Sequence, residues 1–362
     1  MRTLTRKEVA ILVELLGGDE VARVMVNRAR LPEDWIHPKY PDLTGGQVEA
    51  FLNIALAKIG AERLPDILAG RLMPKWEKNV QLLVDKNGRC IPDGLLSNVV
   101  GANRNFFQNQ PTLDTAGITA LLARHKEYCH FPCAAFPSVN EIETRYAAIL
   151  QWLNLPENEE NGAKNLLNVP HFLGVLPQIP AGDHGAILES LVEAAGRSYI
   201  KQFPNRKFYN NLRGQLVDNV KIADSARYGE FVRRATTGSL VWASFRTCLQ
   251  GFSIPADREQ EARMPSRFIL SGGWDTAADI IGYPEILARD FNTPGLDIAA
   301  LQFGSAVYSL CFVAGGSGLD FNHRYLAAYG DSAGGLLLLG CILDQGFWSL
   351  VQNLFQSRFT DA

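Results

Sequence analysis

The sequence predicts an α+β protein, with a helical N-terminal region followed by a domain built on short strands. Helical patterning with N-terminal capping motifs dominates residues 1–160. The segment Pro156–Gly162 is polar and acidic and is bounded by Pro and Gly, which is typical of a linker. From Leu296 onwards, short apolar runs are broken by Gly, Asn and Asp, which is typical of strands joined by turns. We therefore expect two domains, residues 1–160 and residues 166–362.

The helices of the first region are predicted from their start signals and their apolar periodicity. Thr5 and Glu8 form a capping box before the apolar run Val9–Leu16. The segment Gln47–Ile67 carries an apolar stripe with a helical period. A second capping box, Ser138 to Glu141, predicts a helix through about Leu153. Residues 72–115 contain Asn, Gly and Pro at short intervals and predict irregular structure.

The second region alternates predicted strands and short helices. Asp183 is placed to cap a helix. Strands are expected at Phe172–Leu176 and Ser239–Phe245, and helices at Ala256–Arg263 and Asp275–Ile286. The C-terminal strand-like runs are Ile298–Phe303, Tyr308–Val313, Leu319–Phe321 and Leu336–Ile342. We expect the last of these to be buried and to pair with the strand around Tyr308–Val313.

Composition limits the classes of function. Apolar residues make up 47% and charged residues 20% of the 362 residues, and the net charge is −3. These values are ordinary for a globular protein, and they favour neither nucleic acid nor an anionic membrane as a partner. We find no signal-peptide pattern at the N-terminus and no run of ~18 apolar residues. A cytoplasmic location is the expectation, and the oligomeric state is left open.

The six cysteines are too sparse to predict a disulfide scaffold. His125, Cys129 and Cys133 would share one face of a continuous helix, but Pro132 predicts that the helix ends before Cys133. A second Cys pair with zinc-ribbon spacing is missing. Metal binding by these three residues therefore stays a minor alternative, and no cofactor is expected.

Gly330–Gly334 fits the G-x-S-x-G pattern of a hydrolase nucleophile elbow, with Ser332 as the serine. Such a serine needs a base and an acid, which in α/β-hydrolases follow the serine in the chain. No histidine follows Ser332, and His323 precedes it. We expect a turn followed by a buried strand, a protein that is not an enzyme, and little effect of Ser332→Ala. A serine hydrolase stays an alternative, as does a structural or assembly protein whose helical half mediates contacts.

The C-terminal half resembles a known fold family. Four segments resemble the end of formylglycine-generating-type C-type-lectin domains: Pro294–Phe303, Tyr308–Phe312, Leu319–Arg324 and Ser332–Leu339. Arg258–Pro265 is similar to the helix and turn that precede this core. The segments Leu249–Ser253 and Leu270–Ala277 are similar to segments of uncharacterised proteins from candidate-phyla bacteria. The resemblance covers about residues 166–345. It implies a C-type-lectin-like ligand-binding domain with a small mixed or antiparallel sheet.

That family includes the variable proteins of diversity-generating retroelements, in which template adenines are randomised, usually within AAY codons. The resulting codons cannot encode Lys, Glu, Gln, Met or Trp. Phe303–Asp344 contains none of these types, although they make up 54 of the 362 residues. About six would be expected in a segment of this length from composition. Tight β-hairpins also deplete long polar residues, so a purely structural cause stays open.

The resemblance implies that the loops at about 303–335 form a variable recognition surface. Tyr gives rigid contact area, and Ser and Asn give adaptable hydrogen bonds, as in antibody loops. The expected ligand-binding residues are Ser305, Tyr308, Ser317, Asn322, His323, Tyr325, Tyr329, Asp331 and Ser332. We expect the polar and aromatic tips to be exposed and to cluster on one face, and the partner to be an unknown protein or small ligand.

Overall fold

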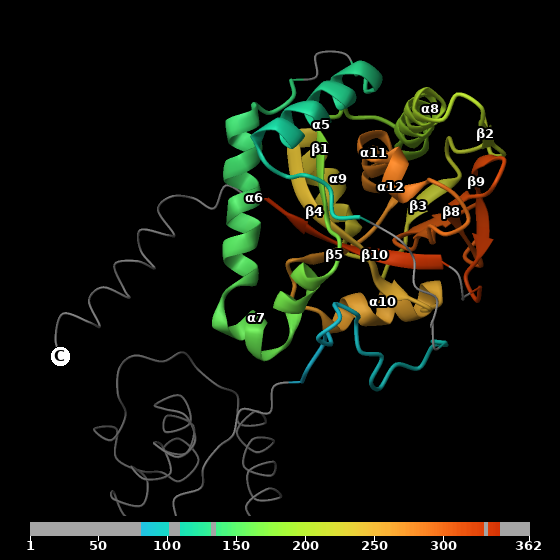
Figure 1. The fold of residues 1–362 in the computed structure, drawn as a ribbon. Coiled ribbons are helices and arrows are strands. Elements are labelled where there is room, and N and C mark those ends of the chain that lie inside the picture. The colour runs from blue at the N-terminus through green and yellow to red at the C-terminus, as the bar shows by residue number, and fades with distance from the viewer. Residues whose placement is uncertain (1–80, 101–108, 132–134, 329–331, 341–362) are drawn as a thin grey trace, which may run out of the picture. The chain divides into compact units, whose positions relative to one another are not determined.

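The computed structural model describes residues 81–100, 109–131, 135–328 and 332–340, and all of them belong to one compact unit, Val80–Ala362. The helices expected between residues 5 and 67 lie outside the described residues, as do Cys133, Tyr329 and Asp331. The described elements combine helices with one large mixed sheet (Figure 1). The α+β prediction is therefore confirmed, although the sheet is larger than expected.

The central sheet contains most of the described strands. Its main path, in spatial order, is β1 (Phe172–Leu176), β4 (Leu240–Gln250), β10 (Ser332–Leu339), β6 (Gly295–Ile298), β8 (Tyr308–Ala314), β9 (Gly318–Tyr325) and β2 (Lys207–Asn210). β5 (Phe268–Leu270) also pairs with β10, and β3 (Val220–Ile222) and β7 (Leu301–Phe303) form a separate pair. The β6–β10 and β2–β9 pairs are parallel and the others are antiparallel.

The helices begin where the capping residues predict. Asp183 accepts a hydrogen bond from the Ala186 N–H, and Ser138 and Glu141 form the predicted capping box. The helices are α5 (Thr115–Tyr128), α6 (Val139–Leu153), α7 (Pro156–Glu160), α8 (His184–Gln202), α9 (Tyr228–Thr237), α10 (Ile254–Arg263), α11 (Gly273–Gly282) and α12 (Pro284–Leu287), with a 3₁₀ helix at Ala163–Asn168.

Helices cover both faces of the sheet (Figure 1). On one side α11 packs against α8, α5 and β1, and on the other α10 lies against β5 and β10. Two adjacent glycines of β10 show how closely these layers approach the strand. A side chain at Gly334 would meet the carboxylate of Asp257 in α10, and one at Gly335 would meet Arg246. Gly334 therefore needs a residue without Cβ, whereas at Gly335 a methyl group would lie 3.2 Å from Arg246 Cδ and the arginine would have to shift slightly.

β10 is a buried strand, as predicted, but it begins at Ser332 and its partners differ from the prediction. It pairs with β4, β5 and β6, and β6 separates it from β8. The prediction of a direct pair with Tyr308–Val313 is therefore wrong. The run Ile298–Phe303 was expected to be one strand, but a turn at residues 299–300 divides it into β6 and β7.

The segment expected to be a linker is folded. Pro156–Glu160 forms α7, and the buried Asn158 side chain donates to the Trp152 carbonyl oxygen at 2.6 Å. α6 lies against β4, and α5 contacts β1. The predicted boundary between residues 160 and 166 therefore falls inside one compact unit. Acidic composition suggested a solvated linker, but Pro at the first helical turn and Glu near it also favour a short helix.

Candidate functional site

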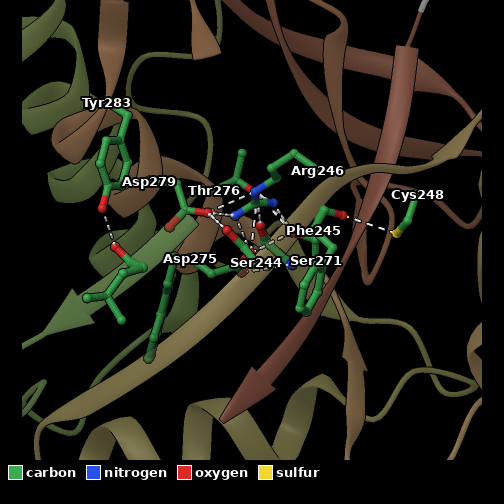
Figure 2. A network of polar contacts seen from close by, with 12 residues as sticks. Ser244, Phe245, Arg246, Cys248, Ser271, Asp275, Thr276, Asp279 and Tyr283 are labelled. Atoms are coloured by element: carbon green, nitrogen blue, oxygen red, sulfur yellow. Dashed lines mark hydrogen bonds and ion pairs between the residues drawn. The ribbon is translucent and has the colours of Figure 1, made fainter. Parts of the chain in front are cut away.

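The most extensive buried polar cluster described joins β4 to α11 around Arg246 (Figure 2). The Arg246 side chain is 1% exposed. Its Nε donates to Asp279 Oδ2 at 2.8 Å, and one terminal nitrogen donates to Asp275 Oδ2 at 2.9 Å. The other terminal nitrogen donates to Thr276 Oγ1 at 3.0 Å and to Ser271 Oγ. The network, which also includes Ser244, thus occupies all three guanidinium nitrogens.

The charges of this cluster do not cancel when both carboxyl groups are ionised. Burial raises the pKa of Asp279 to about 6, although Arg246 and the Ser244 hydroxyl favour the ionised form. Among the residues that the structure describes, Asp279 Oδ1 has no hydrogen-bond partner, which adds to the cost of the charge. A proton on Asp279 removes the excess negative charge. We assign the cluster a structural role, in which it links β4 to α11, because burial keeps any substrate from its polar atoms.

The free energy of unfolding should fall as the pH rises from about 4 to about 7, because the buried Asp279 carboxyl group ionises in this range. The pKa of Asp279 in the folded protein, about 6, lies above its ordinary value of 3.8. The protonated carboxyl group therefore contributes fully to stability below about pH 4, and this contribution is lost as the pH rises past 6. The shift corresponds to about 3 kcal/mol. Urea midpoints measured from pH 4 to 7 should fall more steeply for the parent than for Asp279→Asn. Parallel pH profiles for the two proteins would contradict this assignment.

Ser332, the serine of the elbow-like motif, does not lie at an exposed tip. It is the first residue of β10 and is 1% exposed, and its Oγ donates to Asp297 Oδ2 at 2.7 Å. Asp297 in turn forms an ion pair with Arg324 at 3.3 Å. No histidine in the described ranges hydrogen-bonds to Ser332. The expectation that Ser332 belongs to the exposed surface is therefore wrong, because the sheet extends further toward the turn than the apolar run indicated.

Ser332→Ala should lower the free energy of unfolding by about 1–3 kcal/mol, which corrects the small effect expected from the sequence. The change removes a donor from a buried carboxylate whose pKa is already raised by burial. Chemical denaturation of the variant beside the parent measures the loss. A fluorophosphonate probe should leave Ser332 unlabelled, because a donor to a buried carboxylate is not activated for attack. Labelling that Ser332→Ala abolishes would favour the hydrolase alternative.

Aromatic side chains gather where β8 begins and β9 ends. Tyr308 pairs with Tyr325 across the strands, with ring centroids 4.6 Å apart and a hydrogen bond of 3.0 Å between the hydroxyls. His323 contacts Tyr308 edge to face at 5.0 Å and lies 6.2 Å from the nearly parallel Phe303 ring. The hydrogen bond from the Tyr308 hydroxyl to Tyr325 raises the pKa of Tyr308. These contacts fix the rings relative to one another.

This cluster is accessible to solvent. Tyr325 is 60% exposed and His323 is also exposed, and Phe303 and Tyr308 are half-buried beside them. Farther along the same face, Phe312 and Phe321 enter the core, so the exposed rings continue a buried row. We name Phe303, Tyr308, His323 and Tyr325 the aromatic patch. Ser305 is exposed in the turn between Phe303 and Val307.

Two of the predicted surface residues lie elsewhere. Ser317 is exposed in the turn that joins β8 to β9, six paired positions from Tyr308 and therefore about 20 Å away. Asn322 is half-buried and pairs with Cys311, so it faces away from His323 on the other side of the strand. Its Oδ1 accepts the His323 backbone N–H at 2.8 Å. The prediction of one cluster that includes Ser317 is therefore wrong, because the hairpin places Ser317 at its opposite end.

His125 and Cys129 approach each other, with Nδ1 and Sγ 3.8 Å apart. Burial lowers the pKa of His125 to about 3 and raises that of Cys129 to about 12. Burial therefore disfavours the thiolate, the form that binds metal. Within the described ranges, no group of three His, Cys, Asp or Glu side chains is placed to hold a metal ion.

Sequence reasoning missed the Arg246 cluster and the place of Phe303 in the aromatic patch. A signal existed for the first: Arg246 is the charged residue of the segment Leu240–Gln250, and Asp275 and Asp279 lie four residues apart on one helix face. Comparison of the chain with protein-family models, with curated proteins and with solved structures gave no match. None of the described helices combines the length and the apolar character needed to cross a bilayer.

Proposed function

We propose that this chain is a binding protein that recognises a partner protein through the aromatic patch. The observation that carries the proposal is the contact between Tyr308, Tyr325 and His323 on an accessible part of the sheet. Tyrosine combines a large apolar ring with a hydroxyl that can bond to a partner, and aromatic residues are enriched among binding hot spots. The patch is open rather than enclosed, which favours a protein surface over a small ligand.

The sheet gives the patch the rigidity that recognition needs. β8 and β9 pair over seven consecutive positions, and the buried rings of Phe312 and Phe321 support the exposed end. The hydroxyl bond between Tyr308 and Tyr325 limits the rotamers of both side chains. Less conformational entropy is therefore lost when a partner binds. Substitutions at the exposed positions would leave the core intact, so the same scaffold can carry different surfaces.

The finer assignment to the C-type-lectin-like family of retroelement variable proteins is part of this proposal. Two observations support it: the α+β architecture, and the absence of Lys, Glu, Gln, Met and Trp from Phe303–Asp344. Diversified positions would be the exposed ones, such as Ser305, His323 and Tyr325, and not the buried leucines of β10. A near-copy of this coding segment that differs at adenines, beside a reverse-transcriptase gene, would support diversification. Coding DNA without such a copy would count against it.

Tyr325→Ala should weaken partner binding by about 1–3 kcal/mol, as truncation of an aromatic anchor commonly does. It should change the free energy of unfolding by no more than about 0.5–1 kcal/mol, because most of the side chain is exposed. The partner can be captured in the cells that encode the chain, with a photo-crosslinking amino acid placed at residue 325. Titration of the purified partner against the parent and the variant then measures the loss of affinity.

Tyr209 provides a matched control, because it is also an exposed tyrosine of the sheet, on β2. Tyr209→Ala should leave the affinity unchanged, and a crosslinker at residue 209 should not capture the same protein. If Tyr209→Ala and Tyr325→Ala lowered the affinity for the partner equally, the aromatic patch would not be the binding surface.

A further inference from the structure

A cavity of about 570 Å³ lies at a distance in the fold from the aromatic patch, between α5, α12 and residues 109–112. Its volume falls within the range of small-molecule sites. Pro111, Leu121 and Tyr283 are buried and give it apolar walls, and Ile286 is half-buried beside them. The cavity therefore offers a lined space that is large enough for a ligand with one or two rings.

Two arginines border this cavity. One terminal nitrogen of Arg124 donates to the Gly282 carbonyl oxygen at 2.7 Å and to Glu285 Oε2 at 2.9 Å. Arg289 uses Nε for Asp290 at 3.1 Å, and no hydrogen bond within the described ranges uses its terminal nitrogens. The second terminal nitrogen of Arg124 is also not used in these ranges. Both guanidinium groups thus keep N–H donors for a further acceptor.

The side chains around the two arginines favour a carboxylate. Glu285 and Asp290 already balance the charges of Arg124 and Arg289, so a monoanion fits the site better than a dianion such as phosphate. The planar guanidinium fork matches the geometry of a carboxylate. We propose that the cavity binds a small carboxylate with a flat apolar body, the carboxylate at Arg289 and Arg124 and the body against Leu121, Pro111 and Ile286. This site is independent of the proposed recognition of a protein partner.

Binding of 2-naphthoate to the full chain, followed by titration with protein-observed or saturation-transfer NMR, tests the site. We expect saturable binding, at least tenfold weaker binding of the neutral isostere 2-naphthamide, and no displacement by inorganic phosphate at equal concentration. Arg289→Gln should weaken naphthoate binding at least fivefold. Arg213→Gln is the charge-matched control, because Arg213 is exposed and pairs with Glu193 away from the cavity.

A steric variant keeps the test independent of the charge change. Ala120 lines the cavity and is exposed, whereas Ala123 is exposed on the same helix without lining it. Ala120→Trp should abolish naphthoate binding, and Ala123→Trp should leave it unchanged, with equal melting temperatures for the two variants. Equal binding of naphthoate and naphthamide, or equal losses in a variant and its control, would overturn the proposal.

Discussion

Arg246→Met should lower the free energy of unfolding by about 3–5 kcal/mol at pH 7, the largest effect that we expect from a single substitution in this protein. Methionine retains an unbranched stem like that of arginine but has no guanidinium group, so it leaves Asp275 and Asp279 buried without their shared cation. The Ser271 and Thr276 hydroxyls also lose a donor. Urea denaturation of the parent and the variant measures the difference, provided that the slopes of the two transitions agree.

A second variant separates loss of charge balance from loss of packing. The triple variant Arg246→Met with Asp275→Asn and Asp279→Asn removes all three charges and should recover part of the lost stability. Arg233→Met serves as the surface control, because Arg233 is exposed and pairs with Glu230 three residues away. It should leave the urea midpoint close to that of the parent, because an exposed ion pair contributes little to stability. If Arg246→Met alone lowered the free energy of unfolding by less than about 1 kcal/mol, the buried ion pairs would not stabilise the link between β4 and α11.

Gly174→Ala should also destabilise the protein strongly and should lower the free energy of unfolding by about 3 kcal/mol or more. Gly174 lies in β1 opposite Trp242 of β4, and a methyl group at this position would lie 2.0 Å from the indole ring. Trp242 is fully buried and packs edge to face on Phe231 at 5.2 Å, so the ring cannot move aside without displacing the core. Thermal and urea denaturation both report the loss.

Gly229→Ala is the matched control for this substitution. Gly229 lies in α9, and no atom lies within 4 Å of a methyl group placed there. Alanine should therefore be neutral or should stabilise by up to about 1 kcal/mol, because it restricts the unfolded chain. In combination with Trp242→Leu, Gly174→Ala should cost less than it does alone, since the indole is gone. Additive losses in that double variant would contradict the steric explanation.

Local features of the structure could be predicted from the sequence because they depend on neighbouring residues. Ser138 and Asp183 cap the expected helices through hydrogen bonds within one turn. Phe172–Leu176 and Tyr308–Ala314 form strands close to the predicted runs, since apolar periodicity reflects burial on a sheet. The order of the strands could not be predicted, because β6 enters between β10 and β8 through contacts that no local pattern encodes.

The candidate surface was predictable only in part, for the same reason. The residue types at 308, 323 and 325 indicated a recognition surface, but their proximity depends on the register Tyr308↔Tyr325. Ser332 was misplaced because a Gly-rich motif is compatible with either a turn or the start of a strand next to close-packed layers. Arg246 was not predicted as the centre of a cluster, because its partners Asp275 and Asp279 lie about 30 residues further along the chain.

The place of β10 in the sheet has a consequence for how the protein is made. β10 joins β1 and β4 on one side to β6, β8 and β9 on the other, and it is the last of the described strands to leave the ribosome. The interval between synthesis of β1 and of β10 is on the order of 10–30 s at ordinary elongation rates. During that interval β4 has an open edge, and the side chains that will cover β10 are exposed. Until β10 has been made, the nascent chain therefore carries an unpaired strand edge of the kind that can pair with another chain.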